Sequence, residues 1–140
     1  MQYSIFEEFY KIGVIPAPEI DFVPHAKPLA ESLLAGGLPV AEVTVRTDAA
    51  PESIRVLARE GNGVPIGAGT VINREQAKAA RDLGAQFLVF FPAEVMGGVK
   101  AIKAISDPFP QLRFIPTGGV RLENLAEYLQ MKKIHTVGGS

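Results

Sequence analysis

The stretch VAEVTVRTDAAPESIRVLAREGNGVPIGAG, residues 40–69, begins and ends with short apolar runs and has a longer amphipathic run between them. Apolar runs of this length indicate buried strands, and apolar residues that recur every three to four positions indicate a helix. The pattern therefore predicts a strand over 40–45, a helix over 49–60 and a strand over 64–68. This order of elements is the βαβ unit from which parallel sheets are built.

The same alternation continues on both sides of this stretch. It predicts strands over 13–17, 40–45, 64–68, 86–91, 112–116 and 135–137, and helices over 3–10, 23–35, 49–60, 73–83, 96–106 and 121–130. Asn73 with Gln76 three residues later resembles a helix-starting capping box, and Gly84 marks the end of that helix. The linkers are short and the composition does not shift, so residues 1–140 are expected to form a single domain.

Composition narrows the class of protein further. The 140 residues are 47% hydrophobic and 21% charged with a formal net charge of −1, which is typical of one globular domain without a general attraction for nucleic acid or anionic membranes. Cysteine is absent, which excludes disulfides, thiolate nucleophiles and cysteine metal sites. No apolar run approaches the ~20 residues of a membrane span. We therefore expect a cytoplasmic protein with no membrane partner.

Polar residues gather where the predicted strands end, which is where parallel α/β folds bind ligands. Glu42, Thr44 and Arg46 share one face of their predicted strand because side chains alternate along a strand. One interpretation is a general base, Glu42, beside a carboxylate clamp, Arg46. The other is a buried structural ion pair. The spacing alone does not choose between them.

Two glycine pairs follow the last two predicted strands, in Thr117-Gly118-Gly119 and Gly138-Gly139-Ser140. Backbone N–H groups at such turns hold phosphate well, so a phosphate site is favoured over simple tight turns. The two histidines, His25 and His135, lie far apart in the sequence and suit surface or packing positions better than metal ligation. We expect neither a metal nor a cofactor.

Several ordered motifs resemble the 2-keto-3-deoxy-6-phosphogluconate (KDPG) and 4-hydroxy-2-oxoglutarate aldolase family. They are AGGLPVAEVTVRT (35–47), GAGTV (67–71), FFPAE (90–94) with GGVK (97–100), and RFIPTGG (113–119). The family is a trimeric (β/α)8 barrel that releases pyruvate by retro-aldol cleavage through a lysine Schiff base. The resemblance therefore implies an aldehyde-lyase scaffold that takes a keto acid or a phosphorylated sugar acid.

The resemblance also implies roles for single residues. Glu42 corresponds to the general base, and Arg46, Thr70 and Phe91 correspond to residues that bind the keto-acid end of the substrate. The residues expected to bind phosphate are Thr117, Gly118, Gly119, Gly138, Gly139 and Ser140.

One departure from the family pattern bears directly on catalysis. A lysine precedes Phe-Phe-Pro-Ala-Glu in the family, whereas Val89 holds that position here. Residues 84–89 resemble the family's fourth strand and residues 90–94 resemble the end of its sixth, as if about one and a half βα units of ~30 residues had been removed between them. Valine cannot form a Schiff base, so we expect aldolase activity to be absent or severely impaired.

A shortened barrel leaves three arrangements open. Six parallel strands can close into a smaller barrel, remain an open sheet, or complete a barrel by exchange between chains. Exposed apolar edges favour a homo-oligomer. Three functions remain: a catalytically impaired aldolase scaffold, a non-enzymatic phosphate-binding, oxyacid-binding or assembly module, and a working aldolase that uses another amine or a site shared between subunits.

Overall fold

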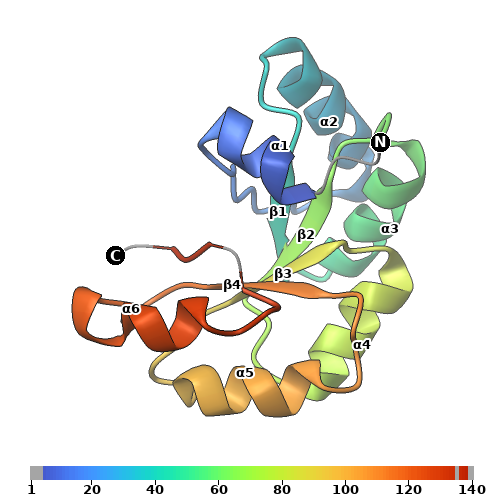
Figure 1. The fold of residues 1–140 in the computed structure, drawn as a ribbon. Coiled ribbons are helices and arrows are strands. Elements are labelled where there is room, and N and C mark those ends of the chain that lie inside the picture. The colour runs from blue at the N-terminus through green and yellow to red at the C-terminus, as the bar shows by residue number, and fades with distance from the viewer. Residues whose placement is uncertain (1–4, 135, 139–140) are drawn as a thin grey trace.

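A computed structural model describes residues 5–134 and 136–138. They form an open parallel sheet with helices packed against it (Figure 1). Four parallel strands lie side by side in sequence order: β1 (Ala41–Thr44), β2 (Ile66–Gly69), β3 (Phe87–Phe90) and β4 (Arg113–Pro116). The helices are α1 (Ile5–Ile12), α2 (Ala26–Ala35), α3 (Ala50–Glu60), α4 (Arg74–Leu83), α5 (Gly98–Ser106) and α6 (Leu122–Leu129), with a 3₁₀ turn, η1 (Val23–His25), before α2. The expected α/β class is confirmed, and the sheet is not closed into a barrel.

Two expected strands, 13–17 and 135–137, do not form as strands. The first runs beside β1, and the Pro16 and Pro18 carbonyls accept hydrogen bonds from the N–H groups of Glu42 (2.9 Å) and Thr44 (3.2 Å). Proline has no N–H to donate, so a continuous ladder cannot develop there. At the other edge, Ile134 and Gly138 make isolated parallel bridges to Phe114 and Thr117, and His135 lies outside the described residues.

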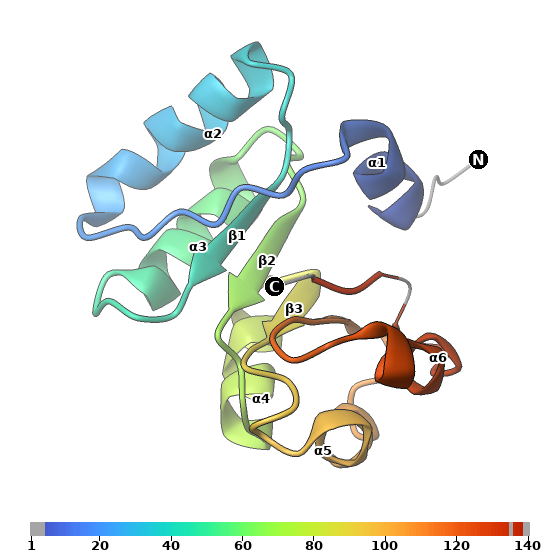
Figure 2. The ribbon, with the colours of Figure 1, turned by 90° about the vertical axis from the view of Figure 1, so that its left-hand side faces the viewer.

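The two faces of the sheet are covered differently (Figures 1 and 2). On the outer face, Val43, Ala68, Leu88 and Phe114 pack against the apolar sides of α2 to α6. On the inner face, a smaller cluster of Val40, Phe87, Val89 and Ile115 packs against α1 through Phe9. The rings of Phe9 and Phe87 meet edge to face, with centroids 4.9 Å apart. Helix α1 thus lies on the opposite side of the sheet from the other helices.

Local signals place the helix ends as expected. The Asn73 side chain accepts a hydrogen bond from the Gln76 N–H at 2.8 Å and starts α4, and Gly84 caps its end. The reciprocal bond of the expected capping box shifts by one residue, because Gln76 accepts from the N–H of Ile72 rather than of Asn73. Among the residues described, none forms a helix long and apolar enough to cross a membrane.

Candidate active site

The carboxyl ends of the parallel strands β1 to β4 lie at the same end of the sheet, and the polar residues singled out in the sequence lie there as far as the structure describes them. β2 contributes only Gly67 and Gly69 to the inner face, and both leave room for neighbouring side chains. A Cβ on Gly69 would stand 2.1 Å from Glu42 Oε1, and a Cβ on Gly67 would stand 2.2 Å from the Phe87 ring. Glu42 and Phe87 therefore lie across the backbone of β2, where any larger residue would displace them.

Glu42 is partly buried on the inner face of β1. Burial raises the pKa of its carboxyl from 4.5 to about 7, while the nearby positive charge of Arg46 lowers it by a smaller amount. A carboxyl that titrates near neutral pH can both accept and return a proton, as a general base requires. No other described residue donates a hydrogen bond to it.

Arg46 lies in an exposed turn beyond the end of β1, which stops at Thr44. The expectation that Arg46 sits on the inner face of the strand is wrong, because the backbone turns before reaching it. No ion pair joins it to Glu42 within the described part of the chain, so the buried structural ion pair is not formed. Arg46 is exposed, and its positive charge still acts on the Glu42 carboxyl.

Thr70 directly follows β2 and has a left-handed backbone, with φ of 59°. This conformation is costly for a β-branched residue, and such strained residues cluster at functional sites. Phe91 follows β3 and is half-buried against the inner cluster. Its ring also lies against Gly118, where an added Cβ would stand 3.1 Å away.

The Thr117-Gly118-Gly119 turn follows β4. Gly118 and Gly119 both have left-handed backbones, with φ of 93° and 79°, which glycine adopts without strain. Gly138 lies beside this turn: its N–H donates to the Pro116 carbonyl at 2.8 Å, and a Cβ on it would stand 2.1 Å from Thr117 Oγ1. Gly138, the first residue of the second glycine pair, therefore lies next to the first pair. Gly139 and Ser140 lie outside the described residues.

Val89 is 5% exposed on the inner face of β3, paired with Ile115 of β4. Its surroundings are the apolar inner cluster, with Glu42 two strands away on the same face. A side chain at this position therefore points into the interior of the site.

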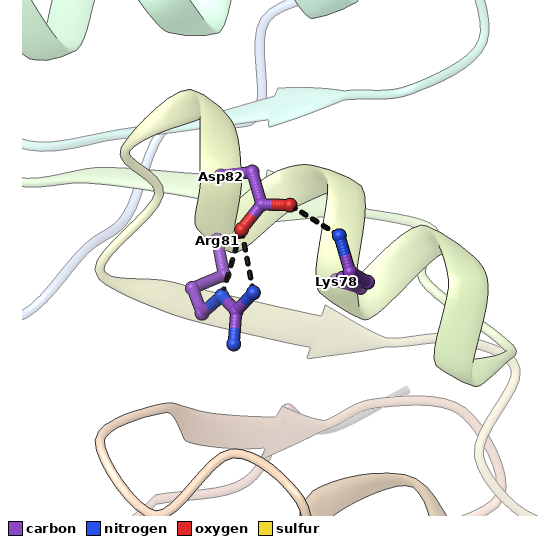
Figure 3. A network of polar contacts seen from close by, with 3 residues as sticks. All are labelled: Lys78, Arg81 and Asp82. Atoms are coloured by element: carbon purple, nitrogen blue, oxygen red, sulfur yellow. Dashed lines mark hydrogen bonds and ion pairs between the residues drawn. The ribbon is translucent and has the colours of Figure 1, made fainter.

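The lysines of the described residues lie on helices or in turns rather than on the strands: Lys11, Lys27, Lys78, Lys100, Lys103, Lys132 and Lys133. Lys78 pairs with Asp82 on the exposed side of α4 at 2.7 Å, and Arg81 binds the same carboxylate (Figure 3). The hydrogen bonds from Lys78 and Arg81 lower the pKa of Asp82. Lys133 donates to the backbone carbonyls of Ser106 and Phe109, next to α5. Neither Lys78 nor Lys133 lies in the inner cluster.

Comparison with known proteins places this geometry in a family. Residues 5–90 and, separately, residues 88–140 match the model of the KDPG and KHG aldolases. The chain belongs to this family. The 2-dehydro-3-deoxy-phosphogluconate aldolase of Dickeya dadantii is 37% identical over 168 positions, which cover 91% of this chain and 79% of that protein.

Solved KDPG aldolases are similar in structure as well. The enzyme from Legionella pneumophila, captured with pyruvate as a covalent carbinolamine, is 34% identical with a TM-score of 0.54, over 90% of this chain and 81% of that one. The enzyme from Zymomonas mobilis ZM4 with 3-phosphoglycerate is 34% identical with a TM-score of 0.53, over 90% of this chain and 79% of that one. The two KDPG aldolase matches overlap within β3, at residues 88–90.

Sequence reasoning missed two residues beside the glycine turn, Asn124 and Tyr128. Asn124 donates to the Gly119 carbonyl at 3.1 Å, and the Tyr128 hydroxyl donates to Glu94. An asparagine three residues after the N-cap of a helix is a weak signal for the first contact. Nothing in the sequence indicates the second, because it joins residues 34 positions apart.

Proposed function

We propose that this KDPG/KHG aldolase family member retains the scaffold and part of the substrate site but has lost ordinary Schiff-base turnover. The observation that carries the proposal is Val89, which points into the site from β3 where the family pattern has a lysine. Imine formation needs an amine whose pKa is lowered enough to attack a ketone, and a valine side chain offers none. Glu42, Thr70 and Phe91 remain in place around the vacated position.

We further propose that the chain is shortened internally at β3. The two separate family matches that overlap at residues 88–90 support this, as does an alignment of 168 positions for a chain of 140 residues. β3 pairs with β2 on one side and with β4 on the other. The sheet is thus continuous, which supports the proposal that residues 1–140 form a single domain.

The expected ligand is a keto acid or a phosphorylated sugar acid, held without covalent chemistry. Glu42 and Thr70 face the keto-acid end, with Arg46 at the rim. Thr117, Gly118, Gly119 and Gly138 face the phosphate end, together with Gly139 and Ser140 by resemblance. Cytoplasmic location and self-association, including exchange of elements between chains, belong to the same proposal.

Reductive trapping with pyruvate tests the loss of turnover. Borohydride reduces an imine to a stable amine, so a lysine that forms a Schiff base gains mass. We expect the intact mass of the wild-type chain to remain unchanged after incubation with pyruvate and borohydride. A stoichiometric adduct would instead support a working aldolase that uses another amine.

Val89→Lys provides the matched positive test. Burial beside the inner cluster lowers the pKa of a lysine at this position, which favours the nucleophilic amine. We expect this variant to form the trapped adduct, while Ile115→Lys on the neighbouring strand serves as a control for a buried lysine at another position. Adduct formation with both lysines or with neither, in folded variants, would count against a site organised around position 89.

A second candidate function is a non-enzymatic phosphate-binding, oxyacid-binding or assembly module. The two consecutive left-handed glycines after β4 favour it, because they form an anion-binding turn without any catalytic group. Thermal shift with 3-phosphoglycerate, pyruvate and inorganic phosphate separates the two functions. Stabilisation by the keto acid supports the aldolase scaffold, and stabilisation by phosphate alone supports the module.

A further inference from the structure

Two backbone hydrogen bonds join the Thr117-Gly118-Gly119 turn after β4 to the loop after β3. The N–H of Ala93 donates to the Thr117 carbonyl at 2.8 Å, and the N–H of Glu94 donates to the Gly118 carbonyl at 3.2 Å. The stem of Glu94 also lies on Gly119, where an added Cβ would stand 2.7 Å from the Glu94 Cβ. The conformation of the glycine turn therefore depends on where Glu94 is held.

Glu94 is held by α6. Its carboxylate accepts a hydrogen bond from the hydroxyl of Tyr128, whose side chain is completely buried. Burial and the neighbouring Glu94 carboxylate raise the pKa of Tyr128, so the hydroxyl keeps its proton and remains a donor. Gly98, the first residue of α5, packs against both partners, 3.0 Å from Glu94 Oε1 and 3.2 Å from the Tyr128 hydroxyl when measured from an added Cβ.

Asn124 holds the same turn from its other end. Its side-chain amide donates to the Gly119 carbonyl at 3.1 Å, and its Oδ1 accepts from the N–H of Arg121 at 2.7 Å. Asn124 and Tyr128 lie four residues apart and thus on the same side of α6. The first two turns of α6 thus contact the glycine turn twice, once directly and once through Glu94.

We propose that Glu94, Tyr128 and Asn124 are positioning residues that hold the Gly118–Gly119 turn in an anion-binding shape. None of the three needs to touch the ligand. Their hydroxyl, carboxylate and amide groups fix the carbonyls of the turn toward α6 and the β3 loop. The N–H groups of the two glycines thereby remain available to a phosphate oxygen. The ligand part of this inference rests on the proposed function; the ordering of the turn does not.

Amide hydrogen exchange tests the ordering of the turn in the free protein. In Tyr128→Phe we expect exchange at the Ala93 and Glu94 amides to accelerate about tenfold, in keeping with the loss of one hydrogen bond to a charged acceptor. Amides of β1 and β2 should keep their rates. Glu94→Gln retains an acceptor oxygen and should preserve protection, whereas Glu94→Ala should not. Tyr10→Phe, at an exposed tyrosine on α1, is the matched control.

Titration with inorganic phosphate, followed through the amide signals of Gly118 and Gly119, tests the consequence for binding. We expect Asn124→Ala and Tyr128→Phe to weaken binding about tenfold and Glu94→Gln to bind as the wild type does. Unchanged exchange at Ala93 and Glu94 in the folded variants, or acceleration spread evenly over all strands, would overturn the inference. If the wild type does not bind phosphate, the proposed phosphate site fails, and the exchange rates still decide whether the three residues order the turn.

If Tyr128→Phe does not fold, Asn124→Ala decides the matter, because Asn124 is only half-buried and its removal leaves the core intact. Faster exchange confined to the 93–94 and 121 amides supports the proposal. Unchanged exchange at these amides contradicts it.

Discussion

At the scale of single residues, the candidate site combines the Glu42 carboxyl, whose pKa is raised to about 7, with an apolar residue, Val89, on the same face of the sheet. Glu42 owes its raised pKa to burial over Gly69, and Arg46 offsets this only in part. Thr70 stores backbone strain next to it. Glu42 and Thr70 have these features in a chain whose residue 89 is apolar.

Glu42 predicts a specific dependence of stability on pH. Its folded pKa of about 7 lies above the unfolded value of 4.5, so the folded state binds more protons between these values. Stability should therefore fall as the pH rises from 4.5 to about 7. This decrease in the free energy of unfolding is on the order of 1 kcal/mol after allowing for the partial solvent exposure of Glu42. Glu42→Gln should abolish it.

Thermal unfolding of both proteins from about pH 4 to about pH 8, a range that includes both pKa values, measures the effect. Glu31→Gln, at an exposed carboxyl of α2, should leave the wild-type profile unchanged. Parallel profiles for wild type and Glu42→Gln would show that Glu42 is solvated like an ordinary surface carboxyl.

The left-handed backbone of Thr70 predicts that the fold tolerates glycine at position 70. Its left-handed backbone costs about 1–3 kcal/mol for a residue of this type, and glycine relieves that strain at an entropic cost of roughly 0.5–1 kcal/mol. Thr70→Gly should thus be neutral or more stable in chemical denaturation. Thr44→Gly, in the buried end of β1, should lose stability by about 1–3 kcal/mol. Equal losses at both positions would argue against strain at Thr70.

At the scale of elements, α1 decides how the inner face is closed. It is the helix that covers the inner cluster, and its contact depends on the edge-to-face packing of Phe9 on Phe87. A cavity of about 470 Å³ lies beside it, lined by residues of α1, by Gly13 and Ile15, and by Thr136 near the opposite edge of the sheet. The two edges of the open sheet thus approach the same cavity.

Removal of the Phe9 ring should loosen this cover. We expect Phe9→Ala to lower the free energy of unfolding by about 3 kcal/mol and to increase binding of an environment-sensitive apolar dye to the native protein. Val95→Ala, at a side chain that is 81% exposed and away from this cavity, should change neither. If Phe9→Ala behaves like Val95→Ala, α1 does not cover the inner face in solution.

At the scale of the whole molecule, β3 connects the two halves of the sheet. Two residues of β3 pair with β2 and four pair with β4, so the sheet runs unbroken through the place where the two family matches overlap. The outer core is likewise continuous, from α2 at one end to α6 at the other. The core is therefore continuous across the strand at which we propose that the chain is shortened.

This continuity predicts a single cooperative unfolding transition. Amides in β1 and in β4 should report the same opening free energy in native-state hydrogen exchange, equal to that of global unfolding. Leu88→Ala in β3 should lower both by the same amount, whereas Leu122→Ala at an exposed position should lower neither. Two separate transitions would contradict the single domain.

Self-association is expected at the same scale, because the extended segments at both edges of the sheet make only isolated hydrogen bonds or bridges. Sedimentation over a range of concentrations measures it. A monodisperse monomer throughout would contradict this part of the proposed function.

The sequence by itself determined the alternation of strands and helices, the helix ends at Asn73 and Gly84, the membership of the aldolase family and the apolar residue at position 89. These depend on local period, capping chemistry and motif order, which neighbouring residues carry. Only the tertiary structure decided that Arg46 leaves the inner face, that Glu42 lies over Gly69, that α1 covers the interior and that α6 fastens the glycine turn through Tyr128. Those arrangements arise from packing between segments far apart in the chain, and no local pattern encodes them.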